Sequence, residues 1–159
     1  MYALRTIFPL VLSLVAACLL YFYYVSSSAS EFFERWTAII SFLVLRMLGF
    51  DLQIHNTILY STDFTIKIID ECTAIGPILL LIGAIAGYPA STIRKLVGIS
   101  AGSLMLFVLN QIRIVNLVWI EMHYPSLLDF AHLVVWQGIV VMVAIVFWFS
   151  WSREFAIKK

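Results

Sequence analysis

Four runs of apolar residues dominate this chain and constrain its fold more than any other feature. They cover residues 7–25, 74–88, 96–119 and 132–151. A helix of about 20 apolar residues crosses the hydrocarbon core of a bilayer, which is about 30 Å thick. The chain is 63% hydrophobic and only 12% charged, and a soluble domain of 159 residues could not bury so much apolar surface. The sequence therefore predicts an all-α integral membrane protein with about four transmembrane helices, in a single membrane domain of residues 1–159.

The first run, residues 7–25, has two possible interpretations: a membrane-spanning helix or a cleaved signal peptide. It is long enough to cross a bilayer, and an apolar segment near an N-terminus can also be a signal peptide. The stretch at 15–18 resembles a lipobox ending in Cys18, but the chain continues with apolar residues to Val25 instead of a polar tether. This continuation favours an uncleaved first span.

Basic residues indicate the orientation of the spans. They precede the first run, occupy the turn after the second and end the chain: Arg5, Arg94, Lys95, Arg153, Lys158 and Lys159. Because basic residues flanking spans stay in the cytoplasm, we expect both termini and this turn to be cytoplasmic. The protein would then be a multi-pass protein of the inner (plasma) membrane, with residues 26–73 on the extracytoplasmic side.

The extracytoplasmic segment is predicted to hold one helix and a small sheet. Residues 31–50 are apolar in the middle but charged at both ends. If they spanned the membrane, the basic turn and tail would face outward, so an interfacial helix in the headgroup region is favoured. β-branched and aromatic pieces, which favour short strands of a β-meander, follow at 52–54, 58–60 and 64–69.

Paired glycines flank the cytoplasmic turn. Gly83 and Gly87 lie in the second span, and Gly98 and Gly102 lie in the third. Small residues at four-residue spacing let helix backbones approach closely, so we expect these two helices to form a tight hairpin. The alternative is ordinary glycine usage in membrane helices.

Three reactive side chains fall at the outer ends of the predicted spans. Cys72 precedes the second span, Arg113 lies in the third and His132 opens the fourth. At about 1.5 Å per residue, Arg113 lies roughly 25 Å along its span, just below the outer boundary. A thiol, a fixed cation and a titratable base would thus share one outer-leaflet layer, as a cysteine acyl-transfer site requires.

Arg113 is the most costly of the three residues to place in a membrane. Asn110, Arg113 and Asn116 recur at three-residue spacing and form a polar stripe on an apolar helix. Such a stripe suits an inward cavity better than lipid. The alternative is an arginine that extends to the lipid headgroups, which does not require the two asparagines.

Cys72 and His132 each have an ordinary explanation as well. A lone cysteine is more often a small buried apolar residue, and a histidine at this depth can simply contact water. A helix N-terminus would favour the Cys72 thiolate, whereas Asp70 and Glu71 would oppose it. Asp129 precedes His132 by three residues, so on an α-helix its carboxylate could orient the imidazole.

Several other kinds of chemistry find no support in the residues. There is no HExxH motif and no Cys/His cluster, so neither a metal nor another cofactor is expected. A thiol oxidoreductase is unfavourable, because Cys18 and Cys72 lie at different depths and form no CxxC motif. Net charge near zero and scattered basic residues argue against nucleic-acid binding.

With these residues the sequence resembles the exosortase and archaeosortase family of membrane cysteine transpeptidases. The resemblance covers residues 64–137 and rests on three stretches: Glu71-Cys72-Thr73-Ala74-Ile75, Asn110-Gln111-Ile112-Arg113-Ile114 and Asp129-Phe130-Ala131-His132. It implies that Cys72 is the nucleophile, Arg113 the transition-state stabiliser and His132 the acid or base. Asn110, Asn116 and Asp129 are interpreted as supporting residues.

The resemblance also implies a function. The enzyme would cleave C-terminal sorting signals, each made of a motif, a transmembrane span and a basic tail, and pass the product to an unknown acceptor amine. Two departures concern Thr73-Ala74, where the family commonly has Ser-Gly, and the short chain, which resembles the compact exosortase H type. The alternative from the residues alone is a non-enzymatic membrane assembly or transporter subunit that binds an anionic ligand at Arg113.

Overall fold

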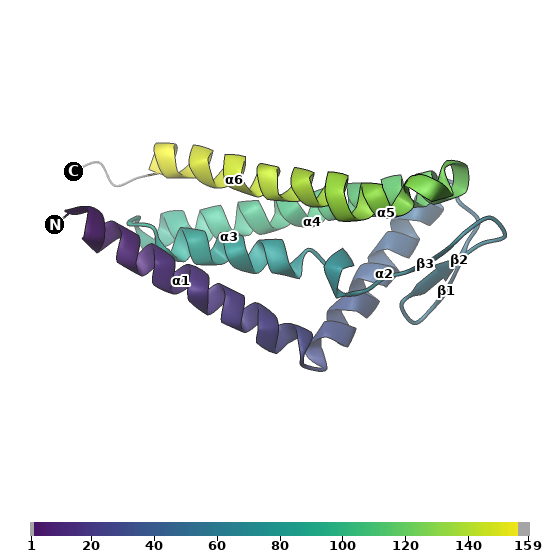
Figure 1. Ribbon diagram of the computed structural model, residues 1–159, viewed down its shortest axis with the longest axis horizontal. Helices are drawn as coiled ribbons and strands as arrows, with labels where there is room; N and C mark the ends of the chain where they lie inside the picture. Colours follow the sequence, from purple (N-terminus) through teal and green to yellow (C-terminus); the bar gives the residue numbers. More distant parts are fainter. Residues whose placement is uncertain (1, 156–159) are drawn as a thin grey trace.

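The computed structural model describes residues 2–155, and their fold is a bundle of membrane helices with a small sheet at one end (Figure 1). The elements in chain order are α1 (Tyr2–Val25), α2 (Ala29–Met47), β1 (Gln53–His55), β2 (Ile58–Tyr60), β3 (Thr65–Lys67), the 3-10 turn η1 (Asp70–Cys72), α3 (Ile75–Gly87), α4 (Thr92–His123), η2 (Pro125–Leu127), α5 (Leu128–Phe130), the π-helical segment η3 (Ala131–Val135) and α6 (Trp136–Phe155). Helices α1, α3, α4 and α6 run along the long axis, and α1 begins and α6 ends opposite the sheet.

Three helical segments are long and apolar enough to cross a membrane: Ile7–Val25, Thr92–His123 and Pro125–Arg153. They correspond to the first, third and fourth predicted spans, so the prediction of a helical membrane protein is confirmed. Helix α3 matches the second predicted span in position but has only 13 residues. At about 1.5 Å per residue it is roughly 20 Å long, shorter than a bilayer core, so four full spans are not confirmed.

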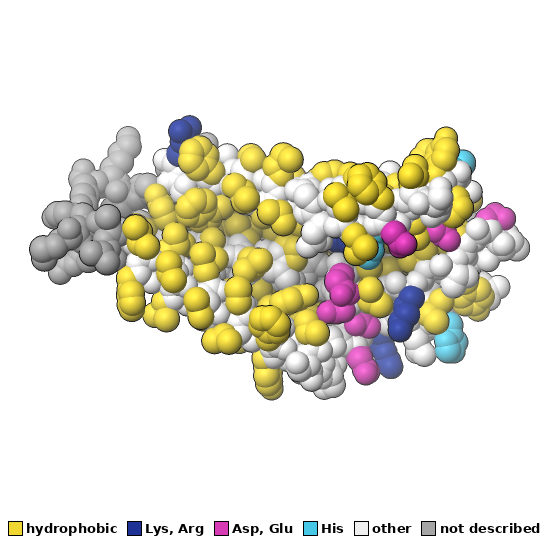
Figure 2. Space-filling view, in the orientation of Figure 1, with side chains coloured by type: hydrophobic (Ala, Val, Ile, Leu, Met, Phe, Trp, Pro, Cys, Tyr) yellow, Lys and Arg dark blue, Asp and Glu magenta, His cyan; other side chains and the backbone are white. Residues whose placement is uncertain are grey.

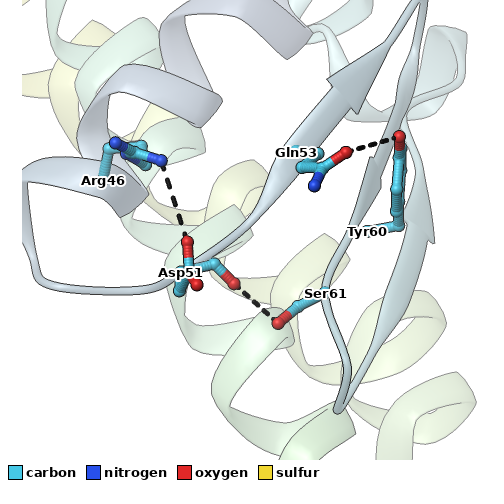
Figure 3. Close-up of polar contacts among 5 residues, drawn as sticks. All are labelled: Arg46, Asp51, Gln53, Tyr60 and Ser61. Carbon is cyan, nitrogen blue, oxygen red and sulfur yellow. Dashed lines mark hydrogen bonds and ion pairs between the residues drawn. The ribbon is translucent and has the colours of Figure 1, made fainter.

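The predicted β-meander is present in the order β1-β2-β3, with both pairs antiparallel. Leu59 on the central strand pairs with Ile54 and Ile66 and is fully buried. Polar contacts lie near the start of β1 and the end of β2 (Figure 3). Arg46 forms an ion pair with Asp51 at 3.8 Å, and the Ser61 hydroxyl donates to the Asp51 carbonyl at 2.6 Å. Tyr60 Oη likewise donates to Gln53 Oε1 at 3.0 Å.

Helix α2 connects the sheet to the membrane bundle. Its buried face includes Ala38, Ser41 and Leu45, and Ala38 and Leu45 join a core that also contains sheet and α4 residues. The Ser41 hydroxyl donates to Gln111 Oε1 on α4 at 2.9 Å, a buried hydrogen bond between distant parts of the chain. The described part of α2 is not among the candidate spans, and its placement in the headgroup region stays a prediction.

Helices α3 and α4 pack against each other, as the predicted hairpin requires, but most of the four glycines contact other helices. Gly83 and Gly87 face α1, where an added Cβ would overlap Ser13 and its neighbours. Gly98 faces the Trp151 ring on α6, and only Gly102 meets α3, through Leu81. Ser13 Oγ also donates to the Gly83 carbonyl at 2.7 Å. Sequence spacing showed where backbones come close but could not indicate which helix approaches.

We expect Gly83→Ala to lower the apparent melting temperature in detergent by several degrees. Its Cβ would lie 2.8 Å from the Ala17 Cβ and 2.9 Å from the Ser13 carbonyl oxygen, so α1 and α3 must separate. Overpacking of this kind costs about 1–3 kcal/mol. The matched control is Gly138→Ala on α6, whose Cβ would meet nothing within 4 Å. Equal thermal unfolding of the two variants would contradict the observed α1–α3 contact.

Candidate active site

Cys72 ends the 3-10 turn that connects the sheet to α3. Its side chain is buried, with 6% exposed, and its backbone N–H donates to the Ile69 carbonyl at 2.8 Å. Thr73 stabilises the same turn, because its hydroxyl donates to the Asp70 carbonyl at 2.7 Å. The thiol is therefore held on a short turn that is fixed by local hydrogen bonds.

The residue that follows this turn has a left-handed backbone conformation. Ala74 has φ 62° and ψ 0° and directly precedes α3. A residue with a Cβ is disfavoured there by about 1–2 kcal/mol, whereas glycine is not. This geometry gives a physical reason for the glycine that the resemblance led us to expect at this position.

Two side chains of α4 bind the backbone around Cys72. Asn110 Nδ2 donates to the Cys72 carbonyl at 2.6 Å, and Arg113 Nη1 donates to the Glu71 carbonyl at 3.2 Å. Both side chains are buried, with 1% and 4% exposed, so Arg113 does not extend to lipid. The inward placement of both residues is therefore as predicted, and their hydrogen bonds fix η1 against α4.

His132 approaches the thiol from the other side. Its Nε2 lies 3.8 Å from Cys72 Sγ, within hydrogen-bonding distance for sulfur. The two residues are 60 positions apart in the chain, so the contact depends on how the C-terminal helices pack against η1. The structure thus brings together the thiol, the imidazole and the guanidinium-bearing helix.

The two remaining predicted supporting residues lie outside this cluster. Asn116 Oδ1 accepts a hydrogen bond from Trp136 Nε1 at 2.9 Å and so fixes the start of α6. Asp129 is exposed, and no hydrogen bond joins it to His132 within residues 2–155. A direct carboxylate–imidazole hydrogen bond is therefore not seen between these two residues, and a supporting role of Asp129 stays a prediction. His132 lies in the π-helical segment. A π-helix has more residues per turn than an α-helix, so two side chains three residues apart do not point in the same relative directions as on an α-helix.

A small cavity of about 50 Å³ adjoins the Arg113 side chain. Asp70, Glu71 and Asn110 line it on the polar side, and Tyr21 and Gln137 line it from α1 and α6. Arg113 Nε is buried and has no hydrogen-bond partner among the described residues. An unpaired buried donor is costly, so it favours an oxygen ligand in this position.

The thiol environment sets its resting protonation state. Burial, the largest effect, raises the pKa of the Cys72 thiol above its ordinary value, and the negative charges of Glu71 and Asp70 raise this pKa further. A backbone hydrogen bond at Ile69 and the positive charge of Arg113 lower the same pKa. The net shift is upward, so the thiol is protonated at neutral pH. A base is then needed for attack, and His132 contacts the thiol. Among the described residues there is no group of three His, Cys, Asp or Glu side chains that could hold a metal ion.

Asn110→Asp should destabilise the protein and disturb Cys72. The change keeps the shape of the side chain but replaces the donor Nδ2 with an oxygen that faces the Cys72 carbonyl. A buried polar group without a hydrogen-bond partner costs about 1–3 kcal/mol. Asn116→Asp is the matched control, since it keeps an oxygen to accept the Trp136 N–H. Thermal unfolding in detergent should rank the two variants in this order. The reverse order would contradict the proposed tether between α4 and η1.

The raised pKa predicts a pH profile for Cys72. In a Cys18→Ser background Cys72 is the only thiol, and its modification by methyl methanethiosulfonate should accelerate with pH. The midpoint should lie above that of an ordinary cysteine, because burial disfavours the thiolate. Arg113→Gln should move the midpoint higher still, since the positive charge lowers this pKa. A midpoint near neutrality would instead indicate a resting thiolate–imidazolium pair.

Comparison with known proteins identifies one family for the chain. No curated protein and no solved structure matches the chain significantly. The family profile described as transmembrane exosortase matches residues 2–151, which include all three clustered side chains and nearly the whole helical bundle. The chain therefore belongs to the transmembrane exosortase family.

Proposed function

We propose that the protein is a sorting enzyme that cleaves C-terminal sorting signals through a thioacyl intermediate on Cys72 and transfers the product to an acceptor. Family membership supports a sorting-related membrane transpeptidase acting on protein substrates. The observation that carries the proposal is the 3.8 Å approach of His132 Nε2 to Cys72 Sγ beside the buried Arg113. A nucleophile and a base at this distance can exchange a proton during attack.

In the first half of the reaction the thiol attacks the scissile carbonyl of the sorting signal. Its proton passes to His132 Nε2 as the sulfur–carbon bond forms, and the carbonyl oxygen becomes an oxyanion. Arg113 supports this step, because its buried Nε has no other partner and its charge stabilises the negative oxygen. The protonated imidazole then donates to the leaving amine, and the thioester to Cys72 remains.

In the second half an amine or water attacks the thioester. His132 accepts the proton of the incoming nucleophile and returns it to the sulfur as the thiol leaves. Transfer to an amine gives a new amide, whereas attack by water gives a free acid. We propose an amine as the physiological acceptor, so that the enzyme acts as a transpeptidase.

The proposed orientation places the site on the extracytoplasmic side of the inner membrane, with both termini in the cytoplasm. The start of α4, which carries Arg94 and Lys95, and the end of α6 lie opposite the sheet, which supports this orientation by the positive-inside rule (Figure 1). The predicted tail residues Lys158 and Lys159 lie outside the described residues. On the face shown in Figure 2, apolar side chains cover the lengthwise helices, and acidic side chains gather between them and the sheet.

Intact-mass analysis tests the nucleophile. The protein is incubated with the C-terminal segment of a protein from the same genome that ends in a short motif, an apolar run and a basic tail. An adduct equal to the mass of the acyl fragment should form and should disappear on treatment with hydroxylamine. Cys18→Ser should keep the adduct, and Cys72→Ala should lose it while remaining folded. Processing of the segment by Cys72→Ala would contradict the assignment.

Arg113→Lys should reduce processing by at least about a hundredfold, the scale of a lost oxyanion donor. Lysine keeps the positive charge but lacks the planar guanidinium, which binds the Glu71 carbonyl through Nη1 and leaves Nε free. Raising the pH should not rescue Arg113→Gln, because a more abundant thiolate does not replace the charge at the oxyanion. Restored turnover at high pH would show that Arg113 acts only on the thiol pKa.

A further inference from the structure

We propose that an apolar groove between α1, α3 and α6 receives the membrane-spanning helix of the substrate, with Gln137 binding the outer end of that helix. This inference rests on the proposed function and adds the place where the sorting signal lies. The groove has a volume of about 490 Å³, and its walls come from these three helices. Its rim includes Phe22, Leu80, Val141 and Ile145, all exposed, so it opens sideways to the lipid.

The groove adjoins the small cavity beside Arg113. Tyr21, Gly76, Pro77 and Gln137 line both the groove and the small cavity beside Arg113. On α1 the groove extends from Leu10 to Phe22, which is about 18 Å of helix. An occupant that fills it from the inner half of the membrane therefore reaches the level of the Arg113 cavity.

Gln137 lies where the outer end of the bound substrate helix is expected. It is an exposed amide on a segment that is apolar enough to span the membrane, and no hydrogen bond satisfies its side chain within residues 2–155. A polar group facing lipid is costly. A helix that starts at this level has four backbone N–H groups without intrahelical partners, and the Gln137 carbonyl oxygen can accept from one of them.

Charge distinguishes a peptide helix from a lipid in this groove. Asp70 and Glu71 line the cavity at its outer end, so a phospholipid tail in the groove would bring its phosphate close to two carboxylates. A substrate helix instead brings neutral peptide groups to that level. The apolar groove and the acidic outer end together favour a transmembrane peptide whose polar part continues toward Cys72.

Cys18 provides a native probe of the groove, because it is exposed and lines the groove wall. In the Cys72→Ser protein it is the only thiol. The probe is a synthetic peptide with a Leu-Ala span of about 20 residues, a polar N-terminal segment, three C-terminal lysines and one cysteine near the outer end of the span. Copper-phenanthroline oxidation in liposomes should give a Cys18–peptide disulfide.

The control moves the thiol by one residue. Leu19→Cys with Cys18→Ser in the same Cys72→Ser protein keeps the depth but points away from the groove, since Leu19 is 64% exposed and does not line it. We expect crosslinking from Cys18 to be at least about tenfold faster than from position 19. Equal rates, or protection of Cys18 by a tightly held lipid, would overturn the proposal. Catalysis plays no part in this experiment, so its failure is distinct from failure of the proposed function.

A second comparison tests whether the groove is used during processing. Ala84 lines the groove, whereas Ala86 on the same helix is exposed and does not. Ala84→Phe should reduce processing of a membrane-anchored substrate at least about tenfold and leave adduct formation with a short soluble motif peptide unchanged. Ala86→Phe should affect neither reaction. Equal effects of the two substitutions on the anchored substrate would contradict occupation of the groove.

Discussion

The site depends on two hydrogen bonds from α4 to the backbone of the turn that carries the thiol. Asn110 binds the Cys72 carbonyl, and Arg113 binds the Glu71 carbonyl. Without these bonds the buried side chains of Asn110 and Arg113 would each lose a hydrogen-bond acceptor, which costs free energy. The same bonds therefore offset part of the free-energy cost of burying the Arg113 guanidinium, and they hold Cys72 at a fixed distance from α4.

Much of this arrangement could be predicted, because the cost of polar groups in a membrane restricts where they can lie. Arg113 and Asn110 had to find partners inside the protein, and three-residue spacing put them on one face of α4. Cys72 and His132 could be assigned to the same layer from the lengths of the apolar runs alone. Their actual contact, at 3.8 Å between Sγ and Nε2, needed the structure.

Other parts were beyond sequence reasoning for identifiable reasons. The glycines of α3 and α4 indicated close backbone contact, but helix periodicity does not specify which neighbour approaches, and Gly83 packs on α1. No residue pattern indicated the π-helical segment, in which His132 lies. No individual role was predicted for Gln111 or Gln137, because a single glutamine in an apolar run has no spacing signal. In the structure Gln111 binds Ser41 and Gln137 lines the groove.

The central claim is that sulfur, guanidinium and imidazole converge on a single carbonyl. A structure of the protein with a peptide aldehyde bound to Cys72 as a hemithioacetal tests it most directly, because the aldehyde oxygen imitates the oxyanion. We expect this oxygen to lie within hydrogen-bonding distance of the Arg113 guanidinium and His132 Nε2 to face the position of the leaving amine. An oxygen directed toward lipid, with Arg113 bound only to the Glu71 carbonyl, would contradict it.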